Sequence, residues 1–576
     1  MAKQAPKAAA APEQGSLPLA PPPAPVSAPP PASTDARPAR RATAESMAQK
    51  QREISVSEFF TKNRHLLGFD NPAKALLTTV KEAVDNALDA CEEAGILPTL
   101  VVEIAEVSEN RYRVAIEDNG PGIVKEQIPK IFAKLLYGSK FHRLKQSRGQ
   151  QGIGISAAGL YAMLTTGKPL VITSKTGQGR VARRVVLRID TRKNQPDVLE
   201  DTAVEWEKDH GTRVELELTG SYRGGRTGVD AYLEQTVVAN PHLELLYLPP
   251  KSEARSYPRA ASELPREAQE IKPHPAGVEL GMLLHMLQDA RGMTVKQALV
   301  DGFSRVSPAL AEQVCVKAGV RGTIKAPDLT GEDAERLHKA LGEVKVLAPS
   351  ASCVVPIGEA LIVEGLKRRF HGAMYFSTTR PPAVYRGNPF VVECGIAYGG
   401  DLPLDESAEV MRFANRVPLQ YQPRACAISE SVYEINWKNY ELQQPRGGLP
   451  VAPMAIFVHL ASVWVPFTSE AKEAVAHYPE LLAEIKLALQ ECGRKLAASL
   501  RARDRAESEA KRRSIFERYI PELGASLSKI TGDDREKIEL AFHRTMTNFV
   551  KVIELPAPAA AAPPDDAAPP AADASA

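Results

Sequence analysis

Residues 78–95 read TTVKEAVDNALDACEEAG, and residues 118–122 read DNGPG. In and just before the first segment, apolar residues recur at the spacing of one helical stripe: Leu76, Val80, Ala83, Val84, Ala87, Leu88 and Cys91. At about 100° per residue, the opposite face collects four polar residues: Glu82, Asp85, Asn86 and Asp89. Because Glu82 and Asn86 are one turn apart, both can touch the same ligand. We therefore predict a helix with a buried stripe and an acidic and amide face, although such a face taken alone is more often simply solvated.

Two further elements follow this helix. The runs LVVEIAEV and RYRVAIE favour two strands, and the second leads Asp118 into a turn where Gly120 and Gly122 let the backbone approach a ligand closely. Next comes SRGQQGIGISAAGLYAML, a glycine segment from Gly149 to Gly154 that runs into an apolar helix. The free N–H groups at the start of that helix would suit phosphate. The order G-x-x-G-x-G differs from the Rossmann fingerprint, and no Walker-type G-x-x-x-x-G-K-[ST] occurs, so neither of those sites is predicted.

The three elements in this order resemble the ATPase domain shared by DNA gyrase, Hsp90, histidine kinases and MutL. The resemblance narrows at three segments: QREISVSEFFTKNRHLLGFDNP (51–72), GSKFHRLKQSRGQQGIGISAAGLYA (138–162) and SVWVPFTSEAKEAVAHYPE (462–480). These look like the B subunits of DNA topoisomerase VI, over roughly residues 51 to 550. The implied fold class is α+β multidomain, with a two-layer α/β sandwich ATPase domain, a small helix-two-turns-helix domain, and an α+β transducer domain with a long C-terminal helix.

The resemblance implies ATP and Mg²⁺ as ligands and assigns the site residues. Glu82 would be the general base for the attacking water, and Lys472 would contact the γ-phosphate. Asn86 would offer an oxygen to Mg²⁺, a hard cation. Asp118 would accept a hydrogen bond from the adenine amino group, with Thr212 holding Asp118 or adenine. The remaining nucleotide contacts are expected at Asp89, Gly120, Gly122, Ser139, Lys140, Gly149, Gln150, Gln151, Gly152, Ile153, Gly154 and Ile155.

Composition divides the chain of 576 residues into several parts. The Ala/Pro-rich ends, 1–50 and 556–576, lack the apolar residues needed to offset ordering entropy and are expected to be disordered. Between them we predict the ATPase domain with its N-terminal arm at 51–245, and a linker with the helix-two-turns-helix domain at 246–325. The transducer domain is expected at 326–478, and C-terminal helices at 479–555.

The function implied by the resemblance is an ATP-driven gate. Two B subunits would close around one DNA duplex, which then passes through a break made by a separate A subunit, so that the complete enzyme is a heterotetramer that relaxes or decatenates DNA. The arm from Ile54 to Leu66 would lie at the B–B contact, and the C-terminal helices would dock the A subunit. An ATP-dependent clamp of mismatch-repair or chaperone type, without strand passage, is the alternative. A histidine kinase is disfavoured because a lone His65 is more often structural.

Charge and composition limit the other classes. The formal net charge of +2 does not demand nucleic acid, so any DNA affinity must be local. Six scattered cysteines form no C-x-x-C pair, which argues against a zinc site and a disulfide framework. The run VAPMAIFVHLASVWVPF (451–467) contains prolines and His459 and favours a buried strand over a membrane span. With no secretory signal at the N-terminus, we expect a cytoplasmic protein.

Overall fold

The computed structural model describes residues 44–48, 51, 54–138, 143–149, 152–190, 194–225 and 227–549. Contacts divide the chain into residues 1–54, which include helix α1 (Ala44–Ala48), and residues 55–576. The rest of the predicted tails lies outside the described residues, as do four expected nucleotide contacts: Ser139, Lys140, Gln150 and Gln151.

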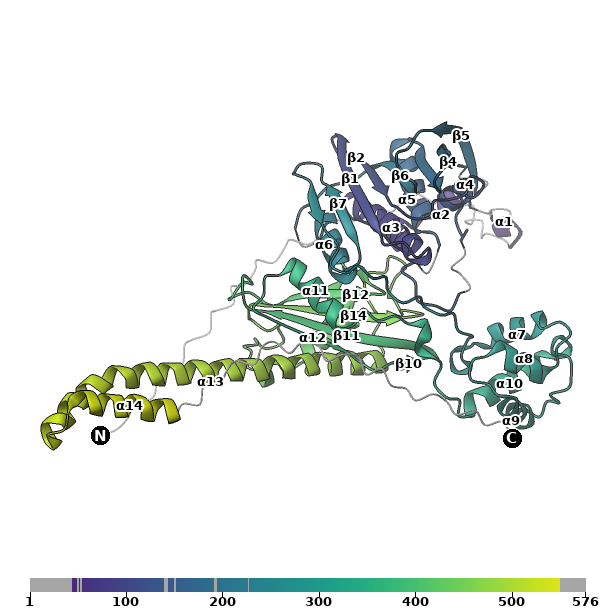
Figure 1. Cartoon of the computed structure of the whole chain (residues 1–576). Coiled ribbons are helices and arrows are strands. Elements are labelled where there is room, and N and C mark those ends of the chain that lie inside the picture. Colours follow the sequence, from purple (N-terminus) through teal and green to yellow (C-terminus); the bar gives the residue numbers. More distant parts are fainter. Residues whose placement is uncertain are drawn as a thin grey trace, which may run out of the picture. The chain divides into compact units, whose positions relative to one another are not determined.

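The ATPase domain is built on an eight-stranded sheet in the order β5-β4-β3-β6-β2-β1-β7-β8. Neighbouring strands are antiparallel except β1 and β7, which are parallel. The strands are β1 Thr99–Ser108, β2 Arg111–Glu117, β3 Leu170–Thr176, β4 Ala182–Asp190, β5 Gln195–Val204, β6 His210–Thr219, β7 Glu244–Leu248 and β8 Arg255–Tyr257. Helices α3 Pro72–Glu93, α4 Ile128–Ala133, α5 Gly154–Thr166 and α6 Val229–Ala239 share one hydrophobic core with them (Figure 1). Helix α2 (Val56–Lys62) and a 3₁₀ turn (Arg64–Leu67) precede α3. The predicted two-layer sandwich is confirmed.

Helix α3 begins where its sequence provides an N-cap. The Asn71 side chain accepts a hydrogen bond from the Lys74 N–H, and Pro72 occupies the first helical position. The predicted apolar stripe is buried throughout. The polar face divides in two, because Asn86 is exposed whereas Asp85 and Asp89 are buried. Of the four polar residues predicted on one helix face, Glu82 and Asn86 therefore remain accessible to a ligand.

Four helices form a separate hydrophobic cluster after the ATPase domain (Figure 1): α7 Leu280–Asp289, α8 Val295–Gly302, α9 Pro308–Ala318 and α10 Gly331–Glu343. Short 3₁₀ turns lie at Pro275–Gly277 and Ala326–Asp328. Capping boxes at Thr294 and Thr330 start α8 and α10, and Gly319 in the left-handed region ends α9. The cluster includes α10, which lies beyond residue 325, where the sequence suggested a boundary.

The transducer is a six-stranded sheet in the order β10-β11-β14-β12-β13, with β9 also paired to β11. Its strands are β9 Met374–Thr379, β10 Ala383–Tyr385, β11 Asn388–Tyr398, β12 Glu409–Ala414, β13 Val417–Pro418 and β14 Met454–Ser462. Helices α11 Glu359–Arg369 and α12 Ala427–Glu434 accompany it, with 3₁₀ turns at Ala351–Cys353, Pro423–Ala425 and Trp437–Tyr440. Every residue of β14 is buried, as predicted for this apolar run. Among the described helices, none combines the length and apolar character needed to cross a membrane.

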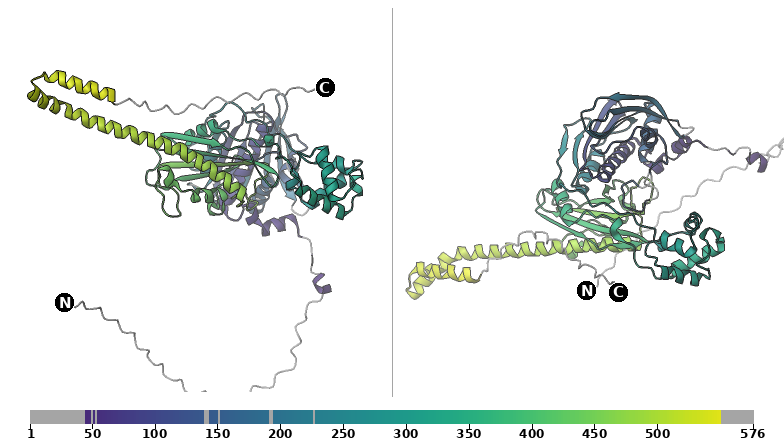
Figure 2. Two further views of the ribbon diagram at one scale, coloured as in Figure 1. Left: turned by 90° about the horizontal axis from the view of Figure 1, so that it is seen from below. Right: turned by 45° about the vertical axis from the view of Figure 1, so that its right-hand side comes forward.

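Helix α13 (Pro479–Thr531) is 53 residues long and so spans about 80 Å at 1.5 Å per residue. Its first part, from Leu481 to Leu500, packs in the transducer core. No residue from 501 to 519 is buried, and burial returns at Ile520 and Gly524. There α14 (Arg535–Phe549) folds back along it, as both views of Figure 2 show. The predicted long C-terminal helix is confirmed as one continuous element.

Candidate functional site

A cavity of about 580 Å³ lies where α3, the β2 turn, the start of α5 and the loop 470–472 meet. This volume is typical of a small-molecule site. Eleven residues predicted from the sequence line it: Glu82, Asn86, Asp118, Gly122, Gly149, Gly152, Ile153, Gly154, Ile155, Thr212 and Lys472. Segments more than 300 residues apart in sequence thus form one wall.

The apolar end of the cavity surrounds one buried carboxylate. Asp118 Oδ1 accepts hydrogen bonds from the Gly120 N–H at 2.8 Å and the Thr212 N–H at 3.1 Å. Burial raises the pKa of Asp118 to about 6 despite these two bonds. Apolar side chains line the same cavity, among them Ala87, Ile116, Ile123, Ile131 and Val214. An apolar slot with one fixed acceptor suits a planar base that carries an amino group.

The turn around Asp118 is held from the neighbouring strands. The Ser174 hydroxyl accepts the Ile123 N–H at 2.8 Å and lies 3.1 Å from the Thr212 hydroxyl. Gly122 has φ 72°, and an added Cβ would lie 2.0 Å from the Lys175 carbonyl oxygen, so glycine is required there. Gly120 does not line the cavity and contributes its N–H to Asp118 instead. Ser174 was missed by the sequence reasoning, because a serine inside a strand carries no local signal.

At the polar end, Glu82 lies against the start of α5. An added Cβ on Gly154 would stand 1.7 Å from Glu82 Oε2, so the carboxylate fits only because residue 154 is glycine. Ile153 provides no side-chain cap for α5, which leaves the first-turn N–H groups available at the cavity. Asn86 is exposed to the same space, and its Oδ1 lies 3.9 Å from the Cβ position of Gly149.

Lys472 enters from the transducer. It is 5% exposed, its backbone φ is 53°, and its Nζ donates to the Arg148 carbonyl oxygen at 3.1 Å. Lys81 Nζ donates to the carbonyl oxygen of Ala471 at 3.4 Å, which fixes the loop beside Lys472. Lys74 forms an ion pair with Glu473 on the other side. Both residues beside Lys472, Ala471 and Glu473, therefore contact lysine side chains of α3.

Two further buried charges, Lys81 and Asp85, interact electrostatically with both Glu82 and Lys472. Burial and the neighbouring Lys472 charge lower the pKa of Lys81. Burial also raises the pKa of Asp85 to about 6, and the Tyr232 hydroxyl donates to Asp85 at 3.0 Å. Neither Lys81 nor Asp85 was predicted as a site residue, because their partners come from α6 and the transducer.

Asp89 does not line the cavity. Its carboxylate accepts a hydrogen bond from Arg148 Nη1 at 2.8 Å, in a buried cluster where Arg148 also pairs with Glu92 at 2.6 Å and donates to Asn240 at 2.6 Å. Burial alone would raise the pKa of Glu92, yet the Arg148 guanidinium holds it well below its usual range. This geometry makes Asp89 a structural ion-pair partner.

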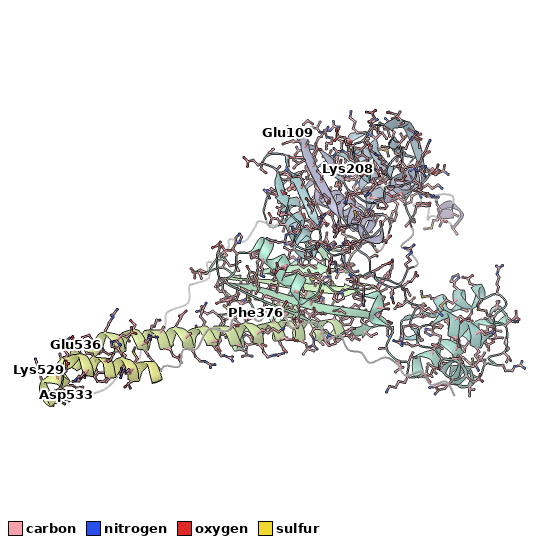
Figure 3. The ribbon with its side chains drawn as sticks, viewed as in Figure 1. Glu109, Lys208, Phe376, Lys529, Asp533 and Glu536 are labelled. Carbon is pink, nitrogen blue, oxygen red and sulfur yellow. The ribbon has the colours of Figure 1, made fainter. Side chains whose placement is uncertain are left out.

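The described residues contain no group of three or more His, Cys, Asp and Glu placed to hold a metal ion. The six cysteines are free and buried. Lys208, labelled in Figure 3, pairs with Glu117 at 2.5 Å on the strand that leads into Asp118. Among the predicted residues that line the cavity, Glu82 and Asn86 supply the side-chain oxygens at its polar end.

Comparisons with known proteins agree with this geometry. The family model "Topoisomerase VI B subunit, transducer" matches residues 349–512, and the model "Histidine kinase-, DNA gyrase B-, and HSP90-like ATPase" matches residues 71–193. The B subunit of Type 2 DNA topoisomerase 6 from Methanosarcina barkeri is 46% identical over 508 residues, covering 88% of this chain and 82% of that protein. Its counterpart in Pyrococcus horikoshii is 37% identical, covering 89% of this chain and 98% of that protein.

A solved structure, the B-subunit of DNA gyrase from Myxococcus xanthus, aligns with 12% identity and a TM-score of 0.39, covering 77% of this chain and 95% of that chain. The sequence relatives and the two family models confirm the resemblance predicted from residues 51–72, 138–162 and 462–480.

Proposed function

Since the chain belongs to the family of topoisomerase VI B subunits and is an ATPase subunit of a type II DNA topoisomerase, we propose that the cavity is its ATP site, with the residue roles that follow. The observation that supports this proposal most strongly is that groups suited to adenine and to phosphate line one cavity. A buried carboxylate lies at the apolar end, and Glu82, Asn86, an uncapped helix start and Lys472 lie at the polar end.

The apolar end would take adenine. Among the described residues, the hydrogen bonds to Asp118 end on Oδ1, so Oδ2 remains to accept the adenine amino group. Thr212 positions Asp118 through its backbone N–H and is itself held by Ser174. The start of α5 would bind phosphate oxygens through backbone N–H groups.

At the polar end, Glu82 would orient the attacking water and accept its proton. The Asn86 amide oxygen and the phosphates would hold Mg²⁺, whose preference for oxygen donors fits this pair of residues. When bound, Mg²⁺ would offset negative charge on the phosphates. Lys472 would exchange its bond to the Arg148 carbonyl for the γ-phosphate, so hydrolysis would remove the partner of a transducer residue.

Function of the whole enzyme would need partners. We propose an ATP-dependent dimer of this chain, with the arm from Ile54 to Leu66 at the contact, and an A subunit that cuts DNA. This action would take place on double-stranded DNA in the cytoplasm. Several large apolar side chains on α13 and α14 are exposed and would contribute to docking the A subunit: Ile515, Phe516, Tyr519, Leu523, Ile530 and Leu540. Figure 3 labels Lys529, Asp533 and Glu536 at the turn between these two helices.

Relaxation of supercoiled plasmid tests this proposal. The chain would be assayed alone and with the candidate A subunit, each with and without ATP and Mg²⁺. We expect relaxation only in the complete mixture. ATP-driven dimerisation without any topological change in every pairing would favour a protein clamp instead.

The Glu82→Ala variant tests the assigned base. It should keep ATP-dependent dimerisation while hydrolysis falls by about 10²–10⁴-fold, the usual contribution of a positioned base. Glu335→Ala, an exposed glutamate on α10, is the matched control and should behave as wild type. Unimpaired turnover in Glu82→Ala would rule out the role.

A further inference from the structure

Two consecutive residues, Ser147 and Arg148, precede the glycine segment 149–154 and are bonded to the transducer. The carbonyl oxygen of Ser147 accepts a hydrogen bond from Asn415 Nδ2 at 3.0 Å, and that of Arg148 accepts one from Lys472 Nζ at 3.1 Å. Both donors belong to the transducer. We call residues 147–149 the segment root, because Gly149 follows directly and lies beside Asn86 in the cavity.

Asn415 is fixed to the central strand of the transducer sheet. Its Oδ1 accepts the Ser462 N–H at 2.9 Å, its Nδ2 also donates to the Ser462 carbonyl at 2.9 Å, and its own N–H donates to the Leu460 carbonyl at 2.9 Å. The side chain is 4% exposed. Its amide thus has both N–H groups and its oxygen engaged, so its position follows that of β14.

The turn that carries Asn415 is conformationally costly. Asn415 and Arg416 join β12 to β13 as the two central residues of the turn, with φ values of 48° and 67°. Asparagine tolerates this left-handed region, whereas arginine does so at a cost. Such strain persists where surrounding contacts hold it, and here Arg416 is buried, with its N–H bonded to His459 at 2.9 Å. The turn is therefore held in one shape against the segment root.

The opposite side of the root is held by the ATPase domain. The Arg148 guanidinium is buried between Asp89 and Glu92 of α3 and Asn240, which caps the end of α6. A shift of the transducer relative to α3 would consequently act on the root, because both domains hold it.

We propose that Asn415 is a positioning residue for ATP hydrolysis: it keeps the segment root in register with the transducer, beside the bond that Lys472 makes to the next carbonyl. This inference rests on the proposed role of Lys472. When Lys472 turns to the γ-phosphate, the Asn415 bond to Ser147 still links a transducer side chain directly to the root. Asn415 touches no substrate and acts through the placement of Gly149 and the residues that follow.

Two variants of the full-length chain test this. Asn415→Gly keeps a residue that tolerates φ 48° but removes the amide. Asn415→Asp keeps the acceptor for the Ser462 N–H and replaces the Nδ2 donor, which serves both the Ser147 and the Ser462 carbonyls, with a second acceptor. The matched control is Asn110→Gly, an exposed asparagine at φ 57° in the β1–β2 turn that does not line the cavity.

Steady-state ATP hydrolysis and binding of a non-hydrolysable ATP analogue would be measured for each. We expect kcat to fall about tenfold or more in both Asn415 variants, while KM and analogue affinity change less than about threefold, since the hydrogen bonds that each variant loses lie away from the ligand. The control should match wild type. In a double-mutant cycle with Lys472→Ala, the two losses should be less than additive, because both residues act on the same root.

Wild-type kcat in the Asp variant, or equal loss of kcat and analogue affinity in both, would overturn the proposal. If Asn415→Gly does not fold, Asn415→Asp decides alone. Failure here is distinct from failure of the proposed ATP site: if Lys472→Ala lowers kcat while both Asn415 variants turn over normally, the positioning role is wrong and the site stands.

Discussion

Replacing Gly154 by alanine should disable hydrolysis without unfolding the protein. The added Cβ would lie 1.7 Å from Glu82 Oε2, 2.2 Å from Cδ and 2.8 Å from Cγ. Ordinary van der Waals contact begins at 3.4 Å, so the carboxylate oxygen must move by about 1.7 Å, further than the ~1 Å misplacement that typically costs 10²-fold in rate. We therefore expect kcat to fall about 10²- to 10³-fold, which corresponds to about 3–4 kcal/mol of activation free energy.

The backbone should accept this change. Gly154 is the first residue of α5 and does not adopt the left-handed region, so alanine suits its conformation and would by itself favour the helix by about 0.4–1 kcal/mol. Gly331→Ala is a matched control, because Gly331 is also the first residue of a helix, α10, and nothing lies within 4 Å of its Cβ position.

The assay is ATP turnover at saturating ATP and Mg²⁺, together with analogue binding and thermal melting. Gly331→Ala should match wild type in all three, and Gly154→Ala should differ in turnover alone. A Gly154→Ala protein that melts normally and keeps kcat within about threefold of wild type would refute the placement of Glu82 as base.

Three other outcomes follow from the site. Lys472→Ala should reduce the affinity advantage of a γ-phosphate analogue over ADP by about tenfold or more, as expected for a charge-assisted hydrogen bond, and an unchanged advantage would exclude that contact. Because burial raises the pKa of Asp118 to about 6 and adenine needs the ionised acceptor, ATP affinity should weaken about tenfold as the pH falls from 7 to 5. In Asp118→Asn, the pH dependence of ATP affinity should reflect only the ionisation of the nucleotide itself. Asp89→Asn should lower the melting temperature yet leave the ATP dissociation constant within about twofold, since its partner is Arg148; a large loss of affinity would return Asp89 to the nucleotide site.

Local pattern predicted the parts of the site that each lie within one element. The helical spacing placed Glu82 and Asn86 together, and the glycines around Asp118 and before α5 marked the close approaches that the structure contains. Family resemblance was needed for Lys472, because a lysine in a loop has no distinguishing local signal.

The remaining contacts join residues far apart in sequence. Helical periodicity could not tell that Asp85 and Asp89 meet α6 and Arg148, whereas Asn86 between them stays open. Asn415 is separated from Ser147 by 268 residues, and its role depends on how two domains pack. Such long-range partners become visible only once the chain is folded.

The unsupported stretch of α13 has a mechanical consequence. Between Leu500, the last buried residue in the transducer core, and Thr531 the helix runs about 46 Å, so a tilt of about 10° at the sheet would displace its far end by about 8 Å. A movement of a few ångströms at Lys472 that tilts the helix would in this way produce a larger displacement at its far end. The helix would then act as a lever arm, and its length would set how far its far end moves for a given tilt at the sheet.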